Sequence, residues 1–277
     1  MRPGPGTLAR SGPTAGRNSV ESTVLEALSP PRQGGVPVTN RTGTGGLDPG
    51  ATAEGLRLLA HLHAEEPTPA LLEALRNAPV ARGPLALDRD DALQAAALVD
   101  EVVSDLPDRI TRRSLAPLAA DFAAIHRSGE LRACPTEGSW LDEELRADAA
   151  ASLACWRSGL EAELRRSPLD RLPDDHVAAE LALLAALLDR GRMIDAVRFL
   201  DRHPLRWVPD FCSRVATRCR EPFFAGIAIL TNALLDDLRD RLGEACGLPR
   251  PAEDGTDVRR RRRWTEGRFP RACTCDP

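Results

Sequence analysis

The stretch that decides the fold runs from His176 to Arg190 and reads HVAAELALLAALLDR. Its apolar side chains recur at spacings of three and four residues, at Val177, Leu181, Leu184 and Leu188. This is the period of an α-helix and places these side chains in one amphipathic stripe. We therefore expect a helix here that buries one of its faces.

The same period continues on the C-terminal side of this stretch. We expect helices at residues 193–203, from Pro204 and from Pro222, because proline is tolerated in the first turn of a helix. The inward-facing side chains of the last two helices are predicted to be Phe211, Val215, Ile227, Leu230, Leu234 and Leu238.

Helical patterns also fill the chain on the N-terminal side. We expect a first helix over residues 52–62 capped by Thr52, a short helix from Pro69, a longer one from Asp88, and two more over residues 112–126 and 142–166. The predicted inner positions are Leu93, Ala97 and Val102 in the third helix and Leu115, Leu118 and Phe122 in the fourth. The sequence therefore predicts an all-α fold.

Composition supports this fold class and narrows the range of functions. Hydrophobic residues make up 42% of the chain, aromatic residues only 4%, and there is no tyrosine. Alanine and leucine dominate the apolar fraction, and both favour helices. The net charge of -4 gives no general attraction to nucleic acid. Lysine is absent, which excludes a Schiff-base or P-loop lysine.

The ends of the chain differ from its centre. Residues 1–50 are rich in glycine, proline, serine and threonine, and we expect a disordered leader there. Residues 51–247 are predicted to form a single helical domain. Residues 248–277, with the run Arg259–Arg263, are predicted to be a disordered tail. We find no signal peptide and no uncharged stretch of membrane-spanning length, so we expect a cytoplasmic protein.

Several short segments, in order along the chain, resemble the TorD family of molybdoenzyme maturation chaperones, which includes the DmsD and NarJ types. The two most telling ones are CWRSGL at residues 155–160 and LPDDHVAAEL at residues 172–181. Further matches are LAADF at 118–122, PTE at 135–137, FLDRHPLRWVP at 199–209 and EPFF at 221–224. The order and spacing of these weak motifs are more specific than any one of them.

The resemblance implies an all-α chaperone that binds the precursor of a molybdopterin-dependent oxidoreductase. The bound element would be a twin-arginine signal peptide or a comparable N-terminal segment, held until the molybdenum cofactor is inserted. We expect no catalytic residue, no metal site and no cofactor of the chaperone's own. The residues expected to bind the client are Asp121, Glu137, Pro173, Asp174, Asp175, His176, Glu180 and Trp207.

Residues 172–180 also have a purely structural interpretation. Pro173 disfavours helix in the residue before it, Asp174 is a natural N-cap, and Asp175 suits the positive end of a helix. His176 and Glu180 are four residues apart and can pair on one helix face. Such a helix start needs no function, whereas the resemblance favours a hinge or ligand-contact role.

Two other functions stay open at this point. One is a helical hydrolase acting through Asp175, His176 and Glu180, although no nucleophile, base and orienting group are evident. The other is a regulatory protein that binds nucleic acid or an acidic partner through Arg259–Arg263. We expect no nucleic-acid binding, because no helix-turn-helix pattern accompanies the arginines. The protein is expected to be a monomer or a dimer swapped through the loop between Leu172 and Asp175.

Overall fold

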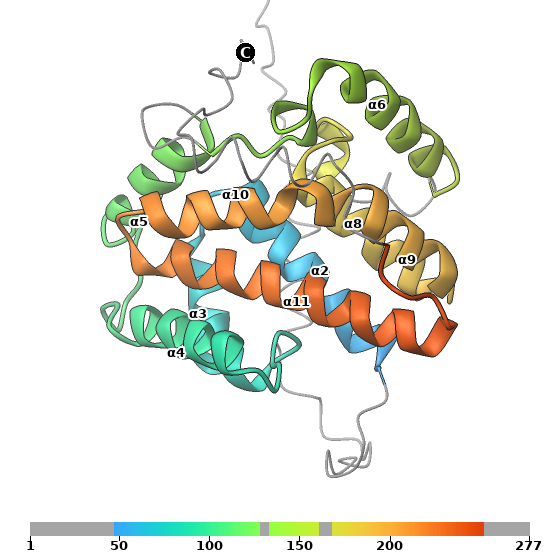
Figure 1. Cartoon of the computed structure of the whole chain (residues 1–277). Coiled ribbons are helices and arrows are strands. Elements are labelled where there is room, and N and C mark those ends of the chain that lie inside the picture. The colour runs from blue at the N-terminus through green and yellow to red at the C-terminus, as the bar shows by residue number, and fades with distance from the viewer. Residues whose placement is uncertain (1–46, 128–132, 161–167, 252–277) are drawn as a thin grey trace, which may run out of the picture.

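The computed structural model describes residues 47–127, 133–160 and 168–251, and in these ranges the chain is helical without a β-strand (Figure 1). The expected leader and tail lie almost wholly outside the described residues. The helices are α2 (Pro49–Ala64), α3 (Pro69–Asn77), α4 (Asp90–Ser104), α5 (Ala116–Phe122), α6 (Glu143–Ser158), α8 (Val177–Asp189), α9 (Met193–Arg202), α10 (Pro204–Arg218) and α11 (Pro222–Cys246). This confirms the all-α prediction.

The helix predicted from residues 176–190 forms the centre of the core. Helix α8 packs against α2, α9 and α10. Its side chains are buried all the way round from Val177 to Leu188, apart from the half-buried Ala182. The expectation of one buried face was therefore wrong, because an alanine- and leucine-rich helix can be enclosed by neighbours on every side.

Helix α11 is the longest helix of the described residues and contacts α2, α4, α9 and α10. It runs beside α10 across one face of the molecule, with α2 behind it (Figure 1). On its other side it meets α4 so closely that a Cβ atom on Gly226 would lie 2.5 Å from Val99 Cγ2 and 2.9 Å from the carbonyl oxygen of Ala95. The absence of a side chain at Gly226 thus sets the distance between the two helices.

This close approach explains why the predicted inner face of α4 was wrong. Leu93 is 45% exposed and Ala97 is also exposed, whereas Val99 and Val103 are buried together with Ala92, Ala95 and Ala96. A helix that approaches a glycine on its neighbour buries its small side chains. The largest apolar side chain therefore does not mark the inner face.

Two helix starts differ from the sequence prediction, and for α2 the reason is its cap. Helix α2 begins at Pro49, and the carboxylate of Asp48 accepts hydrogen bonds from the backbone N–H groups of Gly50 and Ala51 at 3.0 and 3.1 Å. Thr52, the predicted cap, lies inside the helix. Helix α4 begins two residues after Asp88, at Asp90. The fourth helix also differs, because α5 continues into a π-helical turn over Ala123–Arg127.

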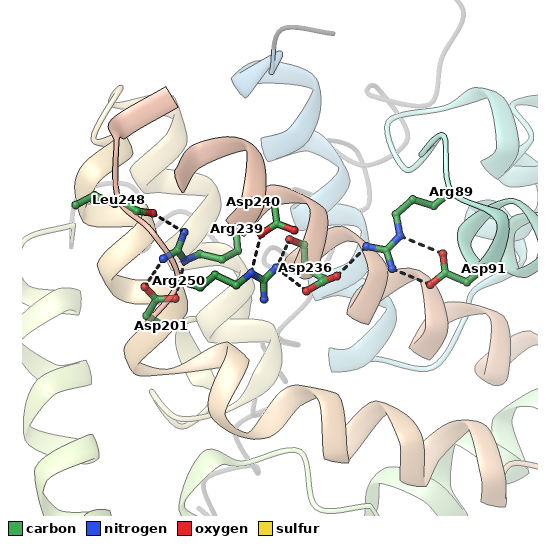
Figure 2. A network of polar contacts seen from close by, with 8 residues as sticks. All are labelled: Arg89, Asp91, Asp201, Asp236, Arg239, Asp240, Leu248 and Arg250. Carbon is green, nitrogen blue, oxygen red and sulfur yellow. Dashed lines mark hydrogen bonds and ion pairs between the residues drawn. The ribbon is translucent and has the colours of Figure 1, made fainter. Parts of the chain in front are cut away.

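Arginine side chains connect the C-terminal end of α11 to neighbouring segments (Figure 2). Arg239, only 1% exposed, donates to both carboxylate oxygens of Asp201 at 2.6 and 2.9 Å, and to the carbonyl oxygens of Leu248 and Pro249. Arg250 pairs with Asp236 and Asp240 nearby, and Asp236 also pairs with Arg89 at the start of α4.

Within the described ranges, none of the helices combines the length and the hydropathy that crossing a membrane requires.

Candidate functional site

The loop before α8 is paired with a segment that lies far upstream in the sequence. Thr136 and His176 form an isolated antiparallel bridge. The N–H of Val177 donates to the carbonyl oxygen of Pro135 at 2.8 Å, and the N–H of Glu137 donates to that of Asp175 at 2.8 Å. Two of the segments that carry the resemblance, PTE at residues 135–137 and LPDDHVAAEL at residues 172–181, are therefore joined by backbone hydrogen bonds.

The sequence pattern predicted Asp174 as the cap of α8, but the cap is His176. The Nδ1 atom of His176 accepts a hydrogen bond from the N–H of Ala178 at 3.1 Å. The helix starts at Val177 because the backbone of His176 is extended, with φ -78° and ψ 137°, where it pairs with Thr136 in the bridge. The ring is 8% exposed, and burial lowers the pKa of His176 to about 4. His176 is therefore neutral at neutral pH, as a cap that accepts through Nδ1 requires.

The two aspartates of the loop have other partners. Asp174 forms an ion pair with Arg157 of α6, in which the side chains are 35% and 25% exposed. Asp175 accepts a hydrogen bond through Oδ2 from the N–H of Gly138 at 3.2 Å. A Cβ atom on residue 138 would lie 3.2 Å from the same oxygen, so glycine allows this close approach. Both aspartates are half-buried, and Pro173 beside them is exposed.

Below the loop lies a fully buried polar cluster. The Oε2 atom of Glu137 lies 2.9 Å from Nδ1 of His203, and both side chains have no exposed surface. The Nε2 atom of the same ring lies 2.9 Å from the hydroxyl oxygen of Ser152 on α6. Glu137 Oε1 is buried without a hydrogen-bond partner among the described residues. The cluster connects the 3-10 turn Glu137–Ser139 with α10 and α6.

Glu180 belongs to the same buried region. The indole Nε1–H of Trp207 donates to its carboxyl oxygens, both at 3.2 Å. Burial first, and the nearby Glu137 second, raise the pKa of Glu180 well above its usual value, while the Trp207 hydrogen bond acts in the opposite direction. The predicted pair of His176 and Glu180 is wrong, since His176 caps α8 and Glu180 faces Trp207. Asp175, His176 and Glu180 thus have separate partners and do not meet as one acid–base set.

Asp121 lies at a different place in the fold. Its Oδ2 atom accepts hydrogen bonds from the N–H groups of Arg220 and Glu221, both at 2.8 Å. These N–H groups stand immediately before α11, whose own cap residue makes no side-chain bond. Asp121 is 3% exposed and serves as the missing cap from another helix. Its carboxylate is therefore not on a surface that a client could reach.

Three side chains of this region were not among the predicted site residues. Arg157 lies inside the motif CWRSGL, and His203 and its neighbours inside FLDRHPLRWVP, so the motifs contained a signal for both. Nothing in the sequence pattern distinguishes Ser152 of α6, which meets His203 at the junction of α9 and α10. Of the eight predicted residues, the structure brings Glu137, Pro173, Asp174, Asp175, His176, Glu180 and Trp207 together.

Comparison with known proteins agrees with the motifs. The family model of the nitrate reductase delta subunit matches residues 87–213. A chain described as chaperone protein TorD, from Actinobacillus succinogenes, is 25% identical over 122 residues, which are 43% of this chain and 62% of that relative. Both findings agree with the resemblance to the TorD/DmsD/NarJ family, each over less than half of this chain. All eight predicted site residues lie inside the segment that matches the family model.

The predicted site residues divide into an exposed part and a buried part. Of the predicted residues, Pro173, Asp174 and Asp175 reach the surface. Beneath them lie the buried side chains of Glu137, His176, Glu180 and Trp207, whereas Asp121 lies elsewhere in the fold. The acidic loop thus lies over a cluster of buried polar side chains. This arrangement suits the binding of a cationic group rather than bond cleavage.

Proposed function

We propose that this chain is a cytoplasmic chaperone for the maturation of a molybdopterin-dependent oxidoreductase. It binds the twin-arginine signal peptide, or a comparable N-terminal segment, of the precursor and assists cofactor insertion and assembly before export. The family match supports the chaperone role. The observation that carries the binding role is the loop of Asp174 and Asp175, which is half-buried and held in place by backbone pairing with Pro135 and Glu137.

The chemistry of this loop fits a pair of arginines. Guanidinium groups bind carboxylates through two parallel hydrogen bonds, and such bonds are stronger when the carboxylate is partly shielded from water. Asp175 is oriented by the N–H of Gly138, and its own carbonyl oxygen is held by Glu137. The loop therefore offers carboxylates whose positions are fixed before a ligand arrives, which lowers the entropic cost of binding.

A binding measurement with defined variants tests this proposal. The full chain is titrated with a synthetic peptide that carries two adjacent arginines followed by an apolar segment. Replacing both aspartates, Asp174→Asn and Asp175→Asn, is expected to weaken binding by roughly tenfold or more, because charge-assisted hydrogen bonds are lost. Asp108→Asn is the control, since Asp108 is an exposed aspartate on another loop. Equal affinities for the wild type and the double variant would contradict the assignment.

The class of client is tested in the native host. Tagged wild-type protein is expected to recover a molybdopterin oxidoreductase, and the Asp174→Asn/Asp175→Asn variant is expected to lose it. Recovery of no such enzyme by the wild type would contradict the chaperone function. The swapped dimer and the role of Arg259–Arg263 stay predictions, and the arginine run lies outside the described residues.

A further inference from the structure

Asp174 is already occupied by an arginine of the chain itself. In the free protein its carboxylate is paired with the guanidinium group of Arg157, close to the end of α6. This is the kind of group that the proposed function requires of a ligand. The pair is partly exposed, at 25% for Arg157 and 35% for Asp174, so a second guanidinium group in solution can reach it.

Helix α6 buries few of its side chains against the neighbouring helices. It lies at the edge of the molecule in Figure 1, and among its residues only Ala149 and Leu153 are buried. Its C-terminal half buries Leu153 in the core and makes polar and aromatic contacts beside it. Ser152 meets His203, and the ring of Trp156 lies edge-on to Phe199 at a centroid distance of 5.6 Å.

These contacts join α6 to the acidic loop in two ways. One connection is direct, from Arg157 to Asp174. The other passes through the buried cluster, from Ser152 to His203 and Glu137, whose N–H binds the carbonyl oxygen of Asp175. A change at the loop therefore acts on the position of the second half of α6.

We propose that Arg157 is an internal competitor that closes the acidic loop, and that an arginine of the ligand displaces it and releases the C-terminal half of α6. This inference rests on the proposed function and adds a residue that determines specificity. A ligand must bring a guanidinium group to replace the one it removes. An ammonium group makes a poorer replacement, because it lacks the planar pair of donors.

The size of the effect follows from the exposure of the pair. A ligand that binds only the open form has its affinity reduced by the fraction of molecules in that form. Partly exposed ion pairs contribute about 0.2–1 kcal/mol, which corresponds to roughly a one-and-a-half- to fivefold change in affinity. Removing the competitor is therefore expected to strengthen binding by about one-and-a-half- to fivefold, whereas most substitutions at a binding site weaken binding.

The test uses Arg157→Gln and a matched control, Arg241→Gln. Arg241 also pairs with an aspartate, Asp237 on α11, with its Nε atom 2.8 Å from Oδ2. Hydrogen exchange of the backbone amides of residues 150–158 is measured without ligand. Binding of the peptide with two adjacent arginines, and of the same peptide with glutamines in their place, is then titrated. Arg157→Gln is expected to exchange faster in α6 and to bind the arginine peptide about one-and-a-half- to fivefold more tightly. Arg241→Gln is expected to match the wild type in both measurements.

Each other result has a definite meaning. Unchanged exchange of α6 in Arg157→Gln overturns the proposal without reference to any ligand. Faster exchange with equal or weaker binding of the arginine peptide overturns the competition and leaves the proposed function standing. If neither protein distinguishes the arginine peptide from the glutamine peptide, the binding function itself fails, and the competition with it. Asp174→Asn provides a check, since it should also release α6 but should not bind more tightly.

Discussion

At the scale of single residues, the buried histidines determine how stability depends on pH. His176, His63 and His126 all have a lowered pKa, in each case mainly because burial disfavours the charged ring. Their folded-state pKa values lie below the ordinary value of about 6.5 for the unfolded chain. The unfolded chain therefore binds more protons in mildly acidic solution. The stability contributed by the neutral rings is complete above that ordinary value and is lost as the pH falls towards the folded-state values.

His176 allows this to be tested without losing the helix cap. In His176→Asn the amide oxygen can still accept the hydrogen bond from Ala178, but the titrating ring is gone. Because the folded-state pKa of His176 is about 4, the unfolded chain binds about one more proton at this residue than the folded chain does between pH 6 and 5. Wild-type stability is expected to fall more steeply than that of the variant, by about 1 kcal/mol per pH unit in this window. Urea unfolding at several pH values measures both slopes, and parallel slopes would contradict the assignment.

The acidic loop shows how far residue roles can be predicted from sequence. The pattern of Pro173, Asp174 and His176 predicted that a helix begins here, and it does. The pattern assigned the cap to Asp174, because a short-range rule cannot include the pairing of His176 with Thr136 from a distant segment. This pairing keeps the backbone of His176 extended, so His176 is at the cap position and Asp174 pairs with Arg157.

At the scale of helices, the distance between α4 and α11 depends on a missing methyl group. Gly226→Ala would place a Cβ atom 2.5 Å from Val99 Cγ2 and 2.9 Å from the carbonyl oxygen of Ala95. We expect a loss of about 1–3 kcal/mol in the free energy of unfolding, because the two helices must move apart. Adding Val99→Ala should restore part of the loss but not all, since the backbone of Ala95 remains in the way.

Gly159→Ala is the control for this prediction. Gly159 follows α6 with a φ of -73°, and the nearest atom to an added Cβ is the carbonyl oxygen of Trp156 at 3.5 Å. Its effect should stay within about 0.5 kcal/mol. Thermal or urea unfolding of the wild type and the three variants gives the comparison. Equal effects of the two glycine substitutions would show that helix spacing is not the cause.

At the scale of the whole molecule, the sequence predicted the order and the approximate limits of the helices but not their packing. Hydrophobic periodicity is a property of one segment, so it located α8, α10 and α11 well. It could not show that α8 is enclosed on all sides, or that α4 presents Val99 rather than Leu93 to its neighbour. The candidate site shows the same limit: the motifs indicated the acidic loop, whereas the partners Arg157, His203 and Ser152 depend on how distant helices cross.

Two arginines at the end of α11 allow a buried ion pair to be compared with exposed ion pairs (Figure 2). Arg239 is 1% exposed and joins α11 to Asp201 of α9 and to the segment that follows α11, whereas the side chain of Arg250 is 42% exposed. Arg239→Gln leaves the carboxylate of Asp201, with 21% of its side chain exposed, without its cation. Breaking a buried pair costs about 3–5 kcal/mol, and an exposed pair contributes at most about 1 kcal/mol. Arg239→Gln should therefore lower the urea midpoint far more than Arg250→Gln. If the two variants unfold at the same midpoint, the buried arginine does not hold the end of the bundle together, and apolar packing of α11 against α9 and α10 is sufficient by itself.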